Sequence, residues 1–381
     1  MVSPQPELTV FFAMESFLGL FSGNETVENF GGAEVKMSAL AKGLAKTGRV
    51  EVILLTEHEV FDTGIPHIQV RKIEMPITRG VPGVSRIINA KRAERTFSHT
   101  TKDVVLMTSQ IENVYIIETA KRQGIPTVYR INADSLVDNS SLVTPEWRQF
   151  VEKRMRAVDH LITQSLYQKE NLQANFGLDS TIMESLCSFP EREYVPSQKN
   201  LILWVGRCVT VKRPWVVLTL AQLRPQYKFV MASPKEEPYL SAAVYEEAAL
   251  LENLTVYNGT SRQDTLDLYE QARLVLSTSW SEAIASTLIE ASVTSTPYIS
   301  YKVDFDESIQ EAGIAHCAQN NLDTLLEMLD KFMTDSEYCM SEAQKAHAYA
   351  LARWNEEKIV NDHINYFLKI SKWGGAHGTQ N

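Results

Sequence analysis

The chain has 381 residues, 44% of them hydrophobic, and its 47 Asp and Glu residues against 37 Lys and Arg give a formal net charge of -10. This length exceeds what one hydrophobic core usually organises, so two domains are expected. The acidic balance disfavours a protein that neutralises nucleic-acid phosphates over its whole surface, and no nucleic-acid partner is predicted.

The cysteines and the hydropathy also narrow the class of protein. Cys187, Cys208, Cys317 and Cys339 follow neither a zinc-site nor a disulfide spacing, and we interpret them as reduced thiols of a cytoplasmic protein. No run reaches the roughly 20 apolar residues of a membrane span, and the N-terminus lacks the basic start of a signal peptide. The protein is therefore expected to be neither conventionally secreted nor embedded in a bilayer.

Short β-branched apolar runs alternate with helical patterns, as in parallel sheets covered on both faces by helices. In the first half, strands are predicted at residues 8–14, 50–56, 68–73, 104–107, 126–131 and 160–163. After the first strand, the stripe Met37, Leu40, Ala41 and Leu44 predicts a helix that ends at Gly48.

A second series of strands follows a polar stretch, residues 187–200, which we interpret as a linker. These strands are predicted at residues 201–205, 227–232, 254–257, 274–277 and 297–301, and residues 343–372 predict two helices broken near Trp354 and Asn355. The patterns together indicate an α/β protein of two doubly wound halves, with a ligand cleft at the carboxyl ends of the strands.

The first informative motif is Gly31-Gly32-Ala33-Glu34, between the first strand and its helix. Two glycines allow close approach of a ligand to the backbone, and a helix N-terminus offers N–H groups to an anion. The alternative is a turn that only needs positive φ. The preceding connection, residues 15–30, is long, which is typical of a functional lid or a mobile flap.

The second motif places Gly206 and Arg207 at the tip of a buried strand, with Lys212 five residues later at the start of the next helix. A planar guanidinium and a compact ammonium together suit the phosphates of a diphosphate. The alternative is a solvated pair of cations. Cations at a helix N-terminus oppose the helix dipole, however, which favours an anionic ligand between them.

The third motif contains Glu282 and Glu290. Eight residues along a helix rise about 12 Å, which is more than the roughly 5 to 9.5 Å between the carboxylates of a glycosidase. The spacing suits two ends of one extended ligand, with a sugar at Glu282 and a ribose at Glu290. The alternative is a pair of solvated surface glutamates.

These motifs resemble those of the retaining GT-B glycosyltransferases of family 4, also called glycosyl transferase group 1. The resemblance rests on GGAEV near the N-terminus, VGR with a lysine five residues further, YEQA at 269–272 and the E-x7-E pair, and it extends from about residue 8 to residue 372. It implies two Rossmann-like domains that face a central cleft, a nucleotide-sugar donor bound mainly by the C-terminal half, and no metal or other cofactor.

The resemblance also implies domain boundaries and roles for individual residues. Residues 1–188 would form the acceptor domain, residues 189–358 the donor domain, and residues 359–381 a C-terminal helix and tail, with the C-terminal helices crossing back to the first domain. Arg207 and Lys212 would hold the diphosphate, Glu282 the sugar and Glu290 the ribose, and the first three would be catalytic. The full donor-binding set is Gly31, Gly32, Gly206, Arg207, Lys212, Glu282, Ala283, Ile284, Ala285 and Glu290.

The chain departs from the family pattern in two places. Ala283 and Ala285 stand where family members often have glycines, and Asn132 stands where many have a histidine. The acceptor-side candidates are therefore Arg130, Asn132, Asp134 and Asp138, with a structural loop network as the alternative.

The resemblance implies a hexosyltransferase of the EC 2.4 class, as used in polysaccharide biosynthesis. Such an enzyme would move a sugar from a nucleotide sugar to a glycan, lipid-linked or small-molecule acceptor with retention of anomeric configuration. The alternatives are a GT-B epimerase or phosphorylase, and a catalytically silent nucleotide-sugar-binding protein, because a fold does not fix a function.

A basic segment, residues 76–102, stands out on this acidic chain. It contains Arg79, Arg86, Lys91, Arg92, Arg95 and Lys102 against the single acidic residue Glu94, and Ile87, Ile88 and Phe97 lie among them. It is predicted to bring the acceptor half to anionic lipid at the inner membrane face. The alternative is a solvated helix face.

Overall fold

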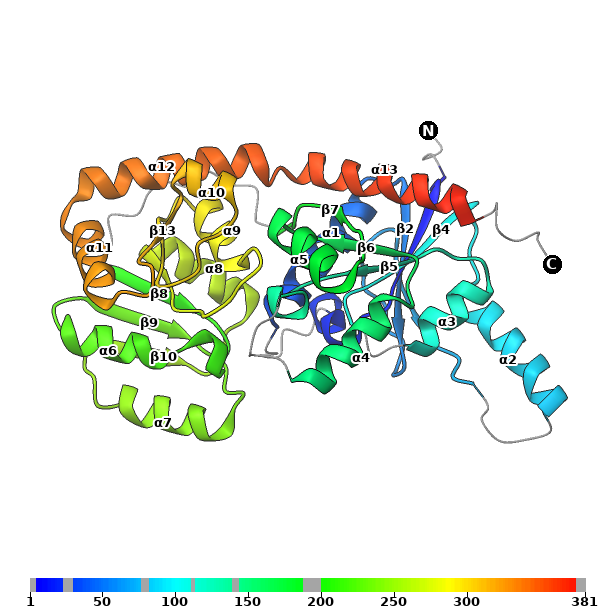
Figure 1. The fold of residues 1–381 in the computed structure, drawn as a ribbon, viewed down its shortest axis with the longest axis horizontal. Coiled ribbons are helices and arrows are strands. Elements are labelled where there is room, and N and C mark those ends of the chain that lie inside the picture. The colour runs from blue at the N-terminus through cyan, green and yellow to red at the C-terminus, as the bar shows by residue number, and fades with distance from the viewer. Residues whose placement is uncertain are drawn as a thin grey trace. The chain divides into compact units, whose positions relative to one another are not determined.

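The computed structural model describes residues 5–22, 30–76, 82–110, 114–138, 144–187 and 200–374. It contains two parallel β-sheets with helices packed around them (Figure 1). The chain divides into two compact units, of which the first contains residues 1–24, 33–186 and 356–381 and the second contains residues 25–32 and 187–355. Most of the predicted linker, residues 188–199, lies outside the described residues.

The first unit is built on a seven-stranded sheet in the order β3-β2-β1-β4-β5-β6-β7, with every pair parallel. Its strands are β1 Leu8–Phe12, β2 Val50–Thr56, β3 Ile68–Lys72, β4 Asp103–Thr108, β5 Thr127–Arg130, β6 His160–Thr163 and β7 Thr181–Ile182. The strands predicted from apolar runs are confirmed. The short strand β7 was missed because both of its residues are exposed and form no apolar run.

The helices of this unit flank the sheet as the alternating pattern predicts. They are η1 Glu15–Phe21, α1 Gly32–Lys46, α2 Pro82–Thr96, α3 Val114–Arg122, η2 Asp134–Leu136, α4 Pro145–Met155, α5 Leu166–Phe176 and α13 Glu356–Gly374. The apolar stripe of α1 is buried as expected. The connection predicted as a lid begins instead with η1, which buries Phe17, Leu18 and Phe21, and residues 23–29 lie outside the described residues.

The C-terminal helix α13 belongs to the first unit, where it packs against β1 and β4 (Figure 1). Its buried stripe includes Val360, Ile364 and Phe367, which follow the spacing of one helix face. Gly43 of α1 permits this packing, because a Cβ there would lie 2.7 Å from Cγ2 of Val360. The C-terminal helix therefore crosses back to the first unit, as the resemblance implied.

The second unit is built on a six-stranded parallel sheet in the order β10-β9-β8-β11-β12-β13. Its strands are β8 Leu201–Val205, β9 Lys228–Ala232, β10 Leu254–Tyr257, β11 Ala272–Ser277, β12 Tyr298–Ser300 and β13 Ala315–Cys317. Its helices are η3 Thr210–Lys212, α6 Trp215–Leu223, α7 Pro238–Ala248, α8 Arg262–Gln271, α9 Ser286–Val293, α10 Glu307–Ala312, α11 Leu322–Thr334 and α12 Ser336–Arg353.

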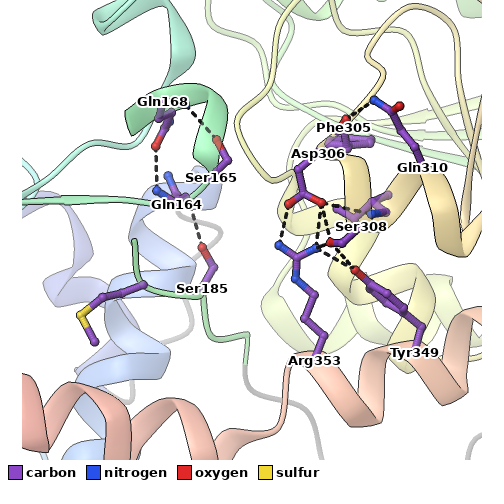
Figure 2. A network of polar contacts seen from close by, with 12 residues as sticks. Gln164, Ser165, Gln168, Ser185, Phe305, Asp306, Ser308, Gln310, Tyr349 and Arg353 are labelled. Atoms are coloured by element: carbon purple, nitrogen blue, oxygen red, sulfur yellow. Dashed lines mark hydrogen bonds and ion pairs between the residues drawn. The ribbon is translucent and has the colours of Figure 1, made fainter. Parts of the chain in front are cut away.

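The last turn of α12 is fixed to the start of α10 by a forked ion pair (Figure 2). Nη2 of Arg353 lies 2.6 Å from Oδ2 of Asp306, and Nη1 also donates to the hydroxyls of Ser308 and Tyr349. Burial alone raises the pKa of Asp306, but the hydrogen bonds and charge of Arg353 hold that pKa below its ordinary value. The chain leaves the second unit directly after this anchor, and the predicted helix break at Trp354 and Asn355 is confirmed.

Candidate active site

The strand order of the second unit reverses between β8 and β11. From β8 the chain proceeds through β9 to β10 on one side, and β11, β12 and β13 then extend the sheet on the other. In a doubly wound sheet, ligands bind beyond the carboxyl ends of the strands at this reversal. Two loops leave the sheet there, and they carry Arg207, Lys212 and Glu282.

The loop after β8 carries Gly206 and Arg207 as predicted. A Cβ on Gly206 would lie 3.0 Å from the indole of Trp204, so a larger residue would have to displace that ring by a few tenths of an ångström where the chain turns off the strand. The half-exposed Arg207 guanidinium donates to both carboxylate oxygens of Glu236, at 2.7 and 3.0 Å. The neighbouring carboxylate of Glu237 accepts from the backbone N–H and the hydroxyl of Thr210. The loop after β9 thus supports the loop after β8.

Lys212 and Glu282 form an ion pair across the two loops. Nζ of Lys212 donates to Oε1 of Glu282, which also accepts from the hydroxyl of Ser279 at 2.6 Å. The two charged side chains keep 23% and 16% of their exposure, so water reaches both without surrounding them. Lys212 lies in the turn η3, three residues before α6 begins, and not at the helix start that the sequence predicted.

The two loops are fixed together by hydrogen bonds to the main-chain carbonyls of the first loop. The N–H of Trp280 donates to the carbonyl of Val211 at 2.7 Å, and the hydroxyl of Thr278 donates to the carbonyl of Lys212 at 2.6 Å. The indole N–H of the buried Trp204 donates to the same Thr278 hydroxyl. These contacts hold the Lys212 and Glu282 side chains at the reversal point of the sheet.

Arg213 is a residue that the sequence interpretation missed. It has a left-handed backbone conformation, with φ of 49°, and its buried guanidinium donates to the carbonyls of Thr278 and Ser279. It also stacks on the rings of Trp280 and Tyr301, at 5.0 and 4.6 Å. Arg213 therefore fastens the Glu282 loop to the sheet. Its position directly after Lys212 was the signal that could have found it.

The segment after Glu282 differs from the prediction. Helix α9 begins at Ser286, four residues after Glu282, and Ala283, Ile284 and Ala285 form a loop in which the last two are buried. Ala285 occupies the N-cap and supplies no side-chain acceptor. The N–H of Leu288 donates to the carbonyl of Ala285, so an anion at this helix end would be bound by the N–H groups of Ser286 and Thr287. Glu282 and Glu290 do not share one helix, so the 12 Å estimate for their separation does not apply.

Glu290 is buried inside the unit rather than presented as an open carboxylate. Its side chain is 4% exposed and lies 2.5 Å from Nη1 of Arg262, the first residue of α8. Burial alone lowers the pKa of Arg262, but the Glu290 carboxylate outweighs burial and raises it. Burial, followed by the charge of Glu290, raises the pKa of the adjacent Tyr269 well above its ordinary value. The sequence interpretation did not predict this pairing with Arg262.

The glycine motif lies where the sequence placed it. Gly31 precedes α1, and Gly32 is the first residue of that helix. Glu34, in the first turn, accepts from the hydroxyl of Ser16 at 2.9 Å. A donor contact of these glycines stays a prediction.

The acceptor-side candidates separate into two groups within the first unit. Arg130, at the end of β5, is 2% exposed and donates to the carbonyls of Met183 and Glu184 and to the hydroxyl of Ser185. One Arg130 nitrogen also lies 3.4 Å from Nε2 of His363 on α13. These contacts support the structural alternative for Arg130, and its acceptor role stays a prediction.

The remaining candidates lie in the loop after β5. Asp138 accepts from the hydroxyl of Tyr167 at 3.4 Å, while Asn132 and Asp134 are half-buried. Burial and then the charges of Asp138 and Asp134 raise the pKa of Tyr167. Three of the four candidates therefore lie along one loop.

A buried polar network lies beside Arg130 and was not predicted. The Gln164 side chain accepts from Ser185 at 2.7 Å (Figure 2). It also accepts from Nζ of Lys36 at 3.0 Å. The backbone N–H of Gln164 donates to the side chain of Gln168 (Figure 2). The network fixes the end of β6 and the segment where the chain leaves the first unit.

Metal ligands and membrane helices were sought in the described part of the chain. There, no three His, Cys, Asp or Glu side chains are grouped as a metal site requires. No helix in the same residues is long and apolar enough to span a bilayer.

Solved structures define the class of fold. Sucrose-phosphate synthase from Thermosynechococcus elongatus matches with a TM-score of 0.74 and 14% identity, covering 95% of this chain and 99% of that one. The Anabaena protein HepE, solved with UDP and glucose, matches with a TM-score of 0.69 and 15% identity, covering 94% of this chain and 98% of that one. HepE has also been solved with UDP-glucose. The two Rossmann-like units therefore match GT-B glycosyltransferase structures.

The sequence comparisons concern the second unit. Residues 189–349 match the family model described as "Glycosyl transferases group 1". D-inositol 3-phosphate glycosyltransferase of Mycolicibacterium smegmatis is 24% identical over 165 residues, which is 40% of this chain. The alignment spans only 37% of that curated relative. The similarity to group 1 glycosyl transferases thus lies in the second unit.

Proposed function

We propose that the protein transfers a hexosyl group from a nucleoside diphosphate sugar to a hydroxyl acceptor with retention of anomeric configuration. The observation that carries the proposal is the Lys212–Glu282 pair at the reversal point of the second sheet, beside Arg207 and the uncapped start of α9. The cations and the backbone N–H groups at the start of α9 suit the anionic diphosphate of such a donor. The carboxylate of Glu282 suits a sugar that gains positive charge during transfer.

In this proposal, Arg207 and Lys212 hold the diphosphate and stabilise the charge that grows on it as the sugar–phosphate bond breaks. Glu282 lies beside the sugar ring and stabilises its developing positive charge. The departing phosphate oxygen accepts the proton of the acceptor hydroxyl, whose oxygen bonds to the anomeric carbon from the same face. No enzyme nucleophile and no metal ion take part.

Glu290 has a different role in the donor site. Its carboxylate, oriented by Arg262, would contact the donor ribose. The acceptor, a glycan, lipid-linked sugar or small molecule, would bind the first unit, where Asn132, Asp134 and Asp138 are the candidates. The basic segment 76–102 would bring that unit to an anionic membrane that carries a lipid-linked acceptor.

The first experiment measures donor binding in the presence of EDTA. UDP, GDP, ADP and dTDP are tested by thermal unfolding, and a ligand at 100 times its Kd should add about 2.7 kcal/mol of stability. Lys212→Met should abolish the shift, whereas Lys153→Met, an exposed lysine on α4, is the matched control. Stabilisation that appears only with Mg²⁺ or Mn²⁺ would overturn the metal-independent mechanism.

The second experiment measures transfer itself. UDP-glucose is the first donor, because the Anabaena neighbour was solved with it, and glycan and lipid extracts serve as acceptors. Proton NMR of the product should show the anomeric configuration of the donor. An inverted product would refute retention, and an isomerised donor without acceptor would indicate an epimerase.

A further inference from the structure

In the part of α2 whose side chains the structure describes, the fully buried residues lie near the C-terminal end of the helix. Ala93 and Thr96 are buried, and Phe97 directly after the helix packs edge-on against Phe11 at 5.2 Å. The rest of the helix extends away from the sheet, as the cyan ribbon of Figure 1 shows. Arg79 and the side chain of Arg86 lie outside what the structure describes.

The face opposite those buried residues carries large apolar side chains. Val84 is 54%, Ile87 63% and Ile88 37% exposed. Their i, i+3, i+4 spacing puts them on one side of the helix, and Lys91 and Arg95 continue the same row towards the C-terminal end. Single exposed apolar residues are ordinary, but a row of three beside cations is typical of a helix that lies in a membrane interface.

The charges on α2 indicate that its partner is anionic. Lys91 and Arg95 are exposed, and Arg95 lies 4.0 Å from Glu74, at the limit of an ion pair. Arg92 lies 3.8 Å from the same carboxylate. The only acidic residue of the helix is Glu94, on a chain whose net charge is -10. A second copy of the chain would bring two basic faces together, whereas an anionic surface complements this one.

We propose that the Val84–Arg95 face of α2 docks on an anionic lipid bilayer. The apolar side chains enter the boundary between headgroups and acyl chains, and Lys91 and Arg95 lie beside lipid phosphates. Each basic side chain near such a surface contributes about fivefold in binding. The proposal deepens the membrane contact proposed for segment 76–102, but it does not depend on the donor chemistry of the second unit.

The experiment is co-sedimentation of the full chain with vesicles of phosphatidylcholine alone and of phosphatidylcholine with phosphatidylglycerol at 3:1. Binding should occur with the anionic vesicles at low salt, fall at least tenfold on neutral vesicles, and decline as salt screens the attraction. Equal binding to both kinds of vesicle, or binding to neither, would overturn the proposal.

Two pairs of substitutions localise the contact. Val84→Gln with Ile87→Gln removes the two most exposed apolar side chains of the face and should weaken binding. Lys91→Gln with Arg95→Gln should reduce binding by about 25-fold at low salt. The controls are Leu250→Gln with Leu351→Gln, which changes two exposed leucines of the second unit, and Lys153→Gln with Lys369→Gln, which removes equal charge elsewhere on the first.

The outcomes separate the candidate partners. The controls should bind as the wild type does, and unchanged binding of both α2 variants would overturn the assignment of the surface. If the wild type is a dimer without vesicles and the apolar variant is a monomer, the face is an interface between copies and the lipid assignment fails. Nucleotide binding, measured on the same variants, should be unaffected, so a failed donor site would not be mistaken for a failed membrane surface.

Discussion

Glu290→Gln should destabilise the second unit as well as weaken donor binding, because the carboxylate is half of a buried ion pair. Removing one partner of such a pair leaves the other charge uncompensated, which costs about 3 to 5 kcal/mol. The Arg262 side chain keeps 25% of its exposure, so water offsets part of the loss and we expect the lower end, about 3 kcal/mol. With a urea m-value of about 2 kcal/mol per M, the unfolding midpoint should fall by about 1.5 M.

The assay is urea unfolding followed by tryptophan fluorescence, with each variant measured beside the wild type. Arg262→Gln with Glu290→Gln removes both charges, so the loss in the double variant should be about 1 kcal/mol, less than for Glu290→Gln alone. Glu252→Gln changes an exposed glutamate of the same unit and should shift the midpoint by less than 0.2 M.

The cycle also isolates the donor contact. Nucleotide affinity is compared between Arg262→Gln and the double variant. Both lack the Arg262 guanidinium, so neither leaves it buried without its carboxylate. A further loss of affinity in the double variant would come from the Glu290 carboxylate itself. A midpoint shift below 0.5 M for Glu290→Gln, or an equal shift in the double variant, would refute the argument from burial.

Two further predictions concern single groups. Glu282→Gln should lower turnover at saturating donor about 100-fold and donor affinity much less, because the interaction of Glu282 strengthens only as the sugar gains charge. Steady-state kinetics and a binding titration measure the two effects. Near-normal turnover would contradict the prediction. Burial, followed by the charge of Arg130, lowers the pKa of His363 to about 3. Below pH 6.5 the unfolded chain therefore binds a proton that the folded chain excludes, so stability falls as the pH falls towards 3. Between pH 7.5 and 5 the wild type should lose about 2 kcal/mol through this group. Urea midpoints of His363→Asn should lack that part of the slope, and parallel slopes would contradict the assignment.

Local patterns predicted the strands and the class of fold because each buried strand is a contiguous apolar run. The strands that were missed have no such run: Thr181–Ile182 is exposed, and Ala315–Cys317 is half-buried at a sheet edge. The position of Glu282 after a buried strand was also readable, but the start of α9 was not. Ala283, Ile284 and Ala285 include no residue type that forbids a helix, so their sequence does not mark where α9 begins.

Contacts between distant segments could not be predicted in this way. Arg262 and Glu290 are 28 residues apart, and they meet only because α8 and α9 flank neighbouring parts of one sheet. Arg130 has polar neighbours in its own loop, which favoured a ligand-side interpretation. Its observed partners come from residues 183–185 and from His363, which is 233 residues further along the chain.

The return of α13 to the first unit has a consequence for synthesis on the ribosome. Residues 187–355 must be made between the last strand of the first unit and the helix that packs on its β1 and β4, which takes about 10 to 30 seconds at ordinary rates of translation. During that interval the nascent first unit lacks the apolar stripe of α13, and Arg130 lacks His363. The second unit has its complete sequence before the first unit does. The first unit, whose strands are made earlier, therefore finishes folding last. A fragment that ends at Leu186 would need α13 supplied as a separate peptide.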